Sequence, residues 1–319
     1  MTGATGFVGS ALVYNLIVDH RRYVRAALRH NIANLPERTE PIYVGDISAD
    51  TDWTSALLNV EVVIHTAARV HIMSDRSVDR FAAYRRVNVD GTLTLAKQSA
   101  ELGVRRFIFI SSIKVNGEKT LIGRPFQACD IAAPIDPYGI SKFEAEVGLL
   151  EIGAKTGMEI SIIRSPLVYG AGVKANFLSM IHWLYKGIPL PLGDIQNKRS
   201  FVALDNLVDL IIRCIDHPAA ANQIFLVSDG EDLSTTELLR KLAFYLGKPA
   251  RLFSVPRWVL DTGAMIFGQK EILQRLCSSL QIDIAKTCQL LNWSPPVSVD
   301  QALERTVEYF LKNIPSYQR

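Results

Sequence analysis

The chain opens with Met1-Thr2-Gly3-Ala4-Thr5-Gly6-Phe7-Val8-Gly9, and the apolar run from Ala11 to Ile17 follows directly. Three glycines spaced three apart, opening into a helical pattern, are typical of a turn that holds a phosphate group at a helix N-terminus. Gly3 would permit the tight turn, Gly6 would let a pyrophosphate approach the backbone, and Gly9 would let the helix pack closely on a sheet. We therefore expect a dinucleotide site here, with these contacts: Gly3, Gly6, Phe7, Val8 and Gly9.

A buried parallel strand should precede such a turn, yet only Met1 and Thr2 stand before Gly3. In a doubly wound sheet that strand is the central one, and each buried aliphatic side chain missing from it forgoes roughly 1.5–3 kcal/mol. We therefore expect this strand to be absent or very short, and the natural product to begin several residues upstream.

The composition is that of an ordinary globular enzyme. The 319 residues include 35 Lys+Arg and 32 Asp+Glu, a net charge of +3, so no large charged surface for nucleic acid is expected. The four cysteines form neither a C-x-x-C pair nor a metal-type cluster, and neither a signal peptide nor a spanning apolar run is present. We expect a cytoplasmic protein without nucleic-acid, metal or membrane partners.

Two short stretches are assigned to ordinary structural roles. Arg105-Arg106 is expected to lie on a solvated face. The apolar stretch from Trp258 to Phe267 is expected to pack in the core, with an exposed amphipathic element that touches a membrane or a partner as the alternative.

Continuous apolar runs alternate with helical patterns through the first half of the chain, which predicts parallel strands covered on both faces. The fold class is therefore α/β, a Rossmann-like doubly wound parallel sheet. We assign residues 1–168 to a dinucleotide-binding domain, with a returning strand near 223–228, and residues 169–319 to a discontinuous, mostly helical substrate lobe. The strands are predicted at 23–28, 41–47, 61–68, 106–112 and 159–164, and long helices at 78–102 and 138–155.

Tyr138 and Lys142 lie four residues apart at the start of a predicted helix, so both project from one face. A neighbouring cation stabilises a phenolate, and it is expected to lower the tyrosine pKa so that the phenol can exchange a proton with a substrate hydroxyl. Ser112 ends a predicted parallel strand, which is where ligands bind in open α/β sheets. These three residues are the predicted catalytic group.

Taken together, the motifs of the chain resemble those of the extended short-chain dehydrogenase/reductases, and the nucleotide-sugar epimerase/dehydratase branch is the nearest match. The motifs that carry this resemblance, in chain order, are the glycine turn, Asp46-Ile47, His65-Thr66-Ala67-Ala68, Asn88-Val89-Asp90-Gly91-Thr92, Ser111-Ser112 and Tyr138-x-x-x-Lys142.

The resemblance implies a role for each matching residue. Ser112 would hydrogen-bond the reacting oxygen, Tyr138 would be the acid/base, Lys142 would also hold the nicotinamide ribose, and Asn88 would maintain the geometry. The cofactor would further contact Asp46, Ile47, Ala67 and Ala68. Asn176 and Arg199 match segments that lie along the nucleotide diphosphate, where an arginine fork can meet phosphate oxygens. Arg275 is a weaker candidate for the same diphosphate.

The implied activity is NAD(P)-dependent redox chemistry at C4 of a UDP-hexose, as in UDP-glucose or UDP-N-acetylglucosamine 4-epimerases. Dehydratases of the family carry an Asp-Glu pair after the catalytic hydroxyl residue, and Ile113 and Lys114 stand there. One alternative is an NADPH-dependent reductase of a UDP-4-keto-6-deoxyhexose, because Asn116 replaces the usual tyrosine. A keto-reductase of a non-sugar carbonyl and a non-catalytic dinucleotide sensor are further alternatives.

The cofactor and the assembly are predicted from local features and from the resemblance. NAD users of the family place an acid at the end of the second strand, where Leu28 stands here, followed by Arg29 and His30. Because Arg29 could pair with a 2′-phosphate, we expect NADP, without excluding NAD. The resemblance also implies a homodimer built from the helices near 88–102 and 138–155.

Overall fold

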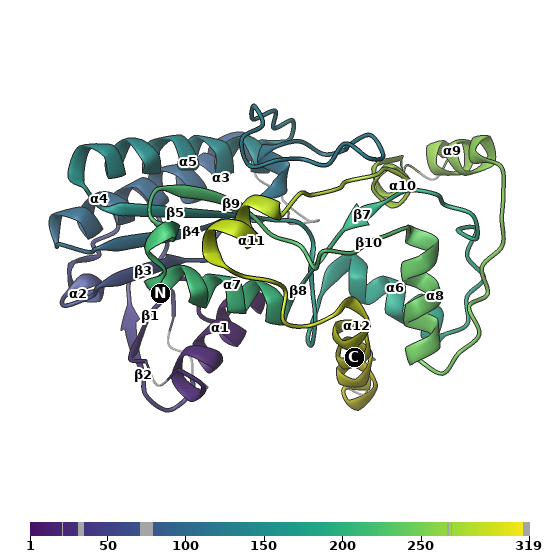
Figure 1. Cartoon of the computed structure of the whole chain (residues 1–319), viewed down its shortest axis with the longest axis horizontal. Coiled ribbons are helices and arrows are strands. Elements are labelled where there is room, and N and C mark those ends of the chain that lie inside the picture. Colours follow the sequence, from purple (N-terminus) through teal and green to yellow (C-terminus); the bar gives the residue numbers. More distant parts are fainter. Residues whose placement is uncertain (21, 31–34, 71–78, 267, 269, 315–319) are drawn as a thin grey trace.

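A computed structural model describes residues 1–20, 22–30, 35–70, 79–266, 268 and 270–314. Its central element is a twisted parallel sheet (Figure 1), in which β3, β4, β5 and β9 pair in that order, and β1 pairs with β2 beside them. These strands are β1 (Val24–Leu28), β2 (Thr39–Tyr43), β3 (Val62–His65), β4 (Arg106–Ser112), β5 (Glu159–Ser165) and β9 (Gln223–Leu226).

The middle strand β4 shows why both faces of the sheet are covered. Phe107 and Phe109 point into an apolar cluster on one face of the sheet, whereas Ile108 belongs to an apolar cluster on the other face. Such alternation of large apolar side chains is expected of a strand that is buried on both sides. The covering helices are α1 (Phe7–Val18) and α7 (Leu204–Asp216) on one face, and α3 (Arg80–Arg85), α4 (Thr92–Glu101) and α5 (Pro137–Thr156) on the other (Figure 1). The predicted doubly wound α/β class is confirmed.

Between β1 and β3, the place of a central strand is taken by two residues. Thr2 forms isolated parallel bridges to Ala27 and His65, and the Met1 carbonyl accepts a hydrogen bond of 2.8 Å from Ala27 N. The terminal ammonium of Met1 donates to Arg25 O at 2.7 Å. Burial lowers the pKa of this ammonium to about 5.

The long helix predicted at 78–102 is irregular in its middle. α3 passes through a π-helical segment, η1 (Arg86–Gly91), before α4 begins, and Val78 lies outside the described residues. Gly91 lies against the loop that follows β2, because a Cβ there would stand 2.4 Å from Ile47 Cγ2. A π segment inside a helix is frequent at functional sites, and this one carries Asn88.

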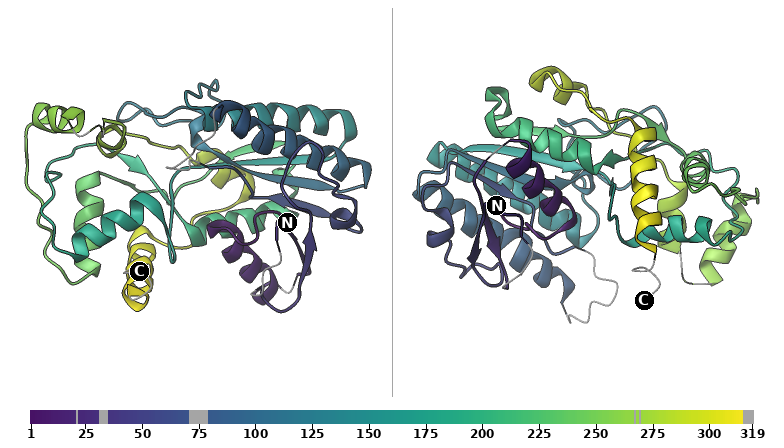
Figure 2. Two further views of the ribbon diagram at one scale, coloured as in Figure 1. Left: turned by 180° about the vertical axis from the view of Figure 1, so that it is seen from behind. Right: turned by 90° about the horizontal axis from the view of Figure 1, so that it is seen from below.

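The second half of the chain builds a mostly helical lobe at one end of the sheet (Figures 1 and 2). Its core joins α6 (Ala175–Tyr185), α8 (Thr235–Tyr245) and α12 (Val299–Lys312). Both α8 and α12 begin with a capping box, from Ser234 with Glu237 and from Ser298 with Gln301.

The remaining elements are short or lie at the edges of these two cores. The short strands are β6 (Val168–Tyr169), β7 (Arg199–Ser200), β8 (Val202–Ala203) and β10 (Asp232–Leu233). The other helices are α2 (Thr54–Leu57), η2 (Ile113–Val115), η3 (Pro218–Ala220), α9 (Arg257–Ile266), α10 (Lys270–Cys277) and α11 (Ala285–Leu291).

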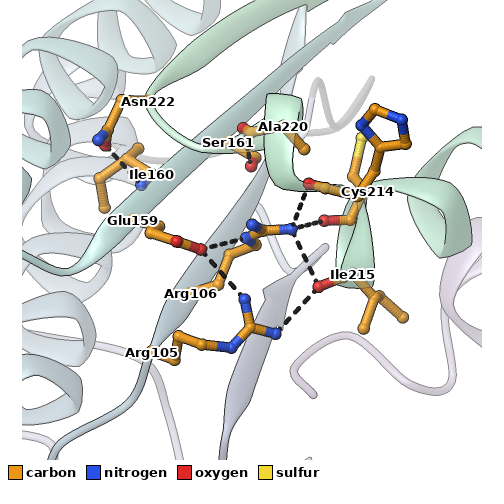
Figure 3. A network of polar contacts seen from close by, with 10 residues as sticks. Arg105, Arg106, Glu159, Ile160, Ser161, Cys214, Ile215, Ala220 and Asn222 are labelled. Atoms are coloured by element: carbon orange, nitrogen blue, oxygen red, sulfur yellow. Dashed lines mark hydrogen bonds and ion pairs between the residues drawn. The ribbon is translucent and has the colours of Figure 1, made fainter. Parts of the chain in front are cut away.

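The expectation that Arg105-Arg106 is a solvated pair is wrong for Arg106, whose side chain is 1% exposed. It forms an ion pair with Glu159 at 2.7 Å, and its Nη1 donates to the carbonyls of Cys214, Ile215 and His217 (Figure 3). These carbonyls close the C-terminal end of α7, where a cation also meets the negative end of the helix dipole. Arg106, the first residue of β4, therefore anchors the C-terminal end of α7 to the sheet.

Replacing Arg106 by alanine should cost about 3 kcal/mol of unfolding free energy, because three carbonyls at the end of α7 would lose their buried donor, while the half-buried Glu159 carboxylate would keep only Arg105. Urea unfolding measures the loss. Arg105→Ala is the matched control: Arg105 also contacts Glu159, but its side chain is 44% exposed, and a loss of about 1 kcal/mol or less is expected. Equal losses in the two variants would contradict this role of Arg106.

Candidate active site

The glycine turn is built so that only glycine fits at two of its positions. Gly3 has a φ of +69°, and a Cβ there would lie 2.5 Å from Thr66 Oγ1. A Cβ on Gly9 would lie 1.9 Å from the Gly3 carbonyl oxygen, so α1 packs directly on the turn. At Gly6 the Cβ position lies 3.2 Å from that same oxygen. Apart from the chain neighbours and the helix's own backbone, no other described atom lies within 4 Å of this position, so the other side of Gly6 is open to a ligand. This cradle fits a pyrophosphate at the N-terminus of α1.

A cleft of about 340 Å³ adjoins the turn. Four predicted cofactor contacts line it: Gly3, Arg29, Ile47 and Ala67. Phe7 and Val8 form the first turn of α1, beside the same glycines. Ala68 follows Ala67 and is half-buried, and Asp46 is exposed at the rim, where its carboxylate pairs with Arg29 Nε at 2.9 Å. In doubly wound sheets a cleft in this position, beside the glycine turn, is where the adenosine half of a dinucleotide would bind.

The predicted catalytic residues come from β4 and from the start of α5. Ser112 is the last residue of β4, and its Oγ accepts a hydrogen bond of 3.3 Å from Lys114 N. α5 begins at Pro137 because the Asp136 side chain caps it, accepting from Gly139 N at 2.7 Å. Tyr138 thereby stands in the first turn of α5, and its ring meets the edge of the buried Tyr84 ring at 6.1 Å.

Lys142 lies one turn further along α5 and is 2% exposed. Its Nζ donates to Ile110 O of β4 at 2.8 Å and stands 4.3 Å from the centroid of the Phe109 ring. Burial lowers the pKa of this ammonium to about 7, and Glu146 opposes that shift. The lysine can therefore exist in both protonation states near neutral pH.

The expectation that Lys142 lowers the Tyr138 pKa does not hold in this structure. Burial raises the pKa of Tyr138, and the nearby charge of Asp136 and the Tyr84 phenol raise it further. The Lys142 ammonium is bonded to the strand at Ile110 O. Lowering the proton affinity of the phenol therefore requires a cation or a hydrogen-bond donor nearer to it than the Lys142 ammonium stands in this arrangement.

Asn88 ties the loop after β3 to the catalytic helix. Its Oδ1 accepts from Arg69 N at 2.8 Å, and its Nδ2 donates to Arg69 O and to Ser141 Oγ, both at 3.0 Å. Ser141 stands between Tyr138 and Lys142 on α5, and Asn88 is 1% exposed. This placement agrees with a positioning role for Asn88.

A buried charged network behind the catalytic strand was not anticipated from the sequence. Arg164 of β5 donates to the Glu146 carboxylate of α5 at 2.6 Å and to Asn116 Oδ1 at 2.9 Å. Ser111 also donates to Glu146, one residue before Ser112. Glu146 follows Lys142 by four residues, so both lie on the same face of α5. This spacing could have indicated a charged pair on that face from the sequence. The network locks α5 against the ends of β4 and β5.

Dehydratases of the resembled family carry an Asp-Glu pair directly after the catalytic hydroxyl residue. In this chain Ile113 and Lys114 stand at those two positions. Ile113 is 4% exposed and belongs to a small apolar cluster. Lys114 Nζ forms ion pairs with Asp136 and with Glu118. Neither residue can act as the acid and base of a water elimination.

The predicted diphosphate ligands lie in the substrate lobe. Arg199 of β7 donates to Arg275 O at 2.9 Å and to Ser278 O at 3.0 Å. Burial and the charge of Arg275 lower the pKa of the Arg199 guanidinium to about 10, so the two guanidinium groups lie near one another. Asn176 is the second residue of α6 and is exposed. Two arginines held together at this position are suited to an anionic ligand.

The described residues form neither a metal-type cluster nor a helix that could span a membrane. Within the part of the chain that the structure describes, no group of three or more His, Cys, Asp and Glu side chains could hold a metal ion. No helix formed by those residues is long and apolar enough to cross a membrane.

The fold and the glycine cradle define a dinucleotide-binding protein of the doubly wound α/β class. Residues 1–228 match the NAD dependent epimerase/dehydratase family. A UDP-glucose 4-epimerase of Vibrio cholerae is 49% identical over 313 residues, which cover 98% of this chain and 95% of that protein. The chain therefore belongs to the NAD dependent epimerase/dehydratase family, and it is an enzyme of the extended short-chain dehydrogenase/reductase type.

Solved structures show the same fold. A UDP-glucuronic acid 4-epimerase from Bacillus cereus in complex with NAD superposes with a TM-score of 0.79 at 23% identity, covering 98% of this chain and 96% of that chain. A UDP-glucose 4-epimerase with UDP-glucose from Thermotoga maritima gives 0.77 at 25% identity, covering 98% of both chains. The predicted family is confirmed.

The depressed Lys142 pKa predicts how the stability of the ligand-free protein changes with pH. The unfolded lysine keeps its proton up to about 10.5, whereas the folded one loses it at about 7, so the unfolded state binds more protons between these values. Relative to Lys142→Met, the wild type should gain stability as pH rises through this window, by at most about 1.4 kcal/mol per pH unit. Urea unfolding of both proteins from pH 6 to about 10 measures the difference. A constant difference across the range would contradict the buried ammonium.

Proposed function

We propose that this chain interconverts the C4 epimers of a UDP-hexose, with UDP-glucose and UDP-N-acetylglucosamine as the first substrates to test. The observation that carries the proposal is the 49% identity, over 98% of the chain, to the Vibrio cholerae UDP-glucose 4-epimerase. The placement of Tyr138, Lys142 and Ser112 at the carboxyl end of β4, beside the dinucleotide cleft, supports it. NAD(P), when bound, supplies the hydride acceptor and donor that such a reaction needs.

In this proposal the protein handles the proton at the C4 oxygen. Ser112 donates a hydrogen bond to that oxygen and orients it toward Tyr138. The Tyr138 phenolate accepts the C4 hydroxyl proton and later returns it. Since burial raises the pKa of Tyr138, the Lys142 ammonium has to leave Ile110 O and approach the phenol for it to ionise. Asn88, through Ser141, keeps this turn of α5 in place.

The diphosphate of the substrate is assigned to the helical lobe. Arg199 and Arg275 would meet the phosphate oxygens, and Asn176 at the start of α6 would donate a hydrogen bond to the same group. Binding of an anion would relieve the repulsion between the two guanidinium groups. The sugar would then lie between this lobe and Tyr138.

Incubating the protein with UDP-glucose and UDP-N-acetylglucosamine, and reading the products by NMR, tests the function. Tyr138→Phe should lose about 10²–10⁴-fold in kcat, because the acid/base would be absent, while UDP binding measured by calorimetry stays unchanged. Tyr23→Phe is the control, since Tyr23 is 97% exposed. Full activity in Tyr138→Phe would refute the role given to this residue.

For the cofactor, we propose a preference for NADP. NAD enzymes of the family place an acid where Leu28 stands, and Leu28, which is 3% exposed, offers no carboxylate. The next residue, Arg29, lines the cleft. The Arg29–Asp46 pair is largely exposed, at 63% and 77%, and a pair of this kind contributes about 0–1 kcal/mol. A 2′-phosphate could therefore draw Arg29 away from Asp46.

Fluorescence titration with NADPH and NADH tests the preference. The wild type should bind NADPH more tightly, and Arg29→Ala should weaken NADPH binding by about tenfold, because one charge-assisted hydrogen bond is lost. NADH binding serves as the internal control and should change little. Equal or tighter binding of NADH by the wild type would overturn the preference.

A second candidate function is reduction of a UDP-4-keto-6-deoxyhexose with NADPH. Arg29 in the cleft favours it, as does Asn116, which binds Arg164 and the Gln127 carbonyl in place of the family's usual tyrosine. Net consumption of NADPH with such a ketone, without conversion of UDP-hexoses, would identify the reductase.

We also propose a cytoplasmic homodimer assembled through α4 and α5. Leu102, Val147 and Leu150 on or next to these helices are 36–42% exposed, which leaves apolar surface for a partner helix pair. Two helices from each copy would then form a four-helix interface.

A further inference from the structure

A short strip of paired backbone segments joins the predicted diphosphate site to the strand that carries Ser112. In the helical lobe, β7 pairs with β10 and also with residues 279–282, where Arg199 forms a parallel bridge with Leu280. Leu280 N donates to Lys198 O at 2.9 Å, and Leu280 O accepts from the next strand residue, at position 200, at 2.8 Å. We call residues 279–282 the bridging segment, because the strand that carries Arg199 is hydrogen-bonded to it.

The bridging segment also pairs with the long loop between η2 and α5, residues 116–136. Thr120 N donates to Ser279 O at 2.9 Å, and Phe126 N donates to Gln281 O at 2.8 Å. In Figure 1 this loop lies at the top and extends from the sheet toward α10. The bridging segment therefore lies between the strand of the diphosphate arginine and the η2–α5 loop.

Apolar packing continues the link as far as Ser112. Ile113, the next residue, is 4% exposed and shares a buried cluster with Leu280 and Ile282 of the bridging segment. One cluster thus contains the residue after Ser112 and the residue bridged to Arg199. A displacement of the bridging segment would therefore change the distance between the predicted catalytic group and the predicted diphosphate site.

Gln281 makes the side-chain contacts that close this strip. Its Oε1 accepts a hydrogen bond from Gly123 N of the η2–α5 loop at 2.7 Å, and its Nε2 donates to Asp232 Oδ2 of β10 at 2.7 Å. Its backbone N donates to Thr120 Oγ1 at 3.0 Å. The other carboxylate oxygen of Asp232 accepts from Ser200 Oγ of β7. One half-buried glutamine therefore ties β10, the bridging segment and the loop together.

We propose that Gln281 is a positioning residue, which holds the η2–α5 loop and Ser112 in register with the diphosphate site. This inference rests on the proposed function, in which the diphosphate binds at Arg199 and the C4 oxygen meets Ser112 and Tyr138. A substrate held by its diphosphate reacts only if its C4 oxygen then reaches the acid/base, and a misplacement of about 1 Å can cost about 10²-fold in rate. Gln281 acts through the segments that it joins.

The kinetics of Gln281→Met test this role, because methionine keeps the length of the side chain and removes both of its hydrogen bonds. For the UDP-hexose that the wild type converts, kcat should fall about tenfold. UDP binding, measured by calorimetry, should stay unchanged, because Arg199 keeps its contacts with Arg275 O and Ser278 O. Gln196→Met is the matched control and should keep the wild-type kcat, since Gln196 is exposed in the same lobe and its amide binds Asp194.

An exchange of the two polar groups tests whether the loss comes from this pair. Gln281→Glu places a second carboxylate against Asp232 and should also lower kcat. Combining it with Asp232→Asn restores an amide–carboxylate pair with the partners exchanged, in which Gly123 N and Ser200 Oγ still find oxygen acceptors. The double variant should therefore recover most of the lost kcat. Thermal unfolding checks that every variant is folded at the assay temperature.

Hydrogen exchange gives a readout that does not depend on turnover. UDP should slow exchange of the amides between Thr120 and Phe126 in the wild type, because a ligand on β7 stabilises the strip that these amides join. This protection should be lost in Gln281→Met and should return in the double variant.

Three results would overturn the inference: no protection of these amides by UDP in the wild type, a wild-type kcat in Gln281→Met, or a loss of UDP affinity with kcat unchanged. The last result would make Gln281 a support of the diphosphate site alone. A wild type that converts no UDP-hexose would refute the proposed function, and hydrogen exchange would still decide the role of Gln281.

Discussion

The contact between Gly9 and the carbonyl of Gly3 is the constraint on which the rest of the structure depends. A single methyl group at Gly9 would lie 1.9 Å from that oxygen, so α1 can approach the turn only because the side chain is absent. This approach places the helix N-terminus beside the cleft and packs the apolar side of α1 on α7 and on the sheet. Binding and folding therefore rest on the same close contact.

The helix α5, which carries Tyr138 and Lys142, is held by charge as much as by apolar packing. Glu146 and Arg164 fix α5 to the neighbouring strands, Asp136 caps it, and Asn88 binds its second turn. Lys142 then lies with its ammonium on a strand carbonyl. A rigid helix with one cation that can move suits the proposed proton transfer, because the phenol would stay in place while the charge beside it changes.

Local sequence patterns predicted the elements well where burial is continuous. β4 was predicted at 106–112 and is found there, and α5 spans 137–156 against a predicted 138–155. β2 was predicted at 41–47 and ends at Tyr43, because it is an edge strand with little buried apolar pattern. The burial of Arg106 could not be predicted, since its partners are carbonyls more than a hundred residues away. For the stretch from Trp258, core packing was expected and an exposed amphipathic helix was the alternative. Trp258, Met265 and Ile266 of α9 are exposed, and apolar periodicity alone could not decide this because it does not say which side of a helix meets protein. Phe267 lies outside the described residues.

The π-helical segment at 86–91 has a consequence for how this chain can vary. Such a wide turn holds one residue more than a regular α-helical ladder needs. Removing one residue there would restore regular hydrogen bonding and leave the flanking helices α3 and α4 in place, but the side chains inside the wide turn would change direction. Asn88 lies in that turn and would leave its present neighbours Arg69 and Ser141. We therefore expect this helix to reject insertions and deletions of the kind that surface loops tolerate. The length of the π-helical segment is then a sensitive marker of a functional active site.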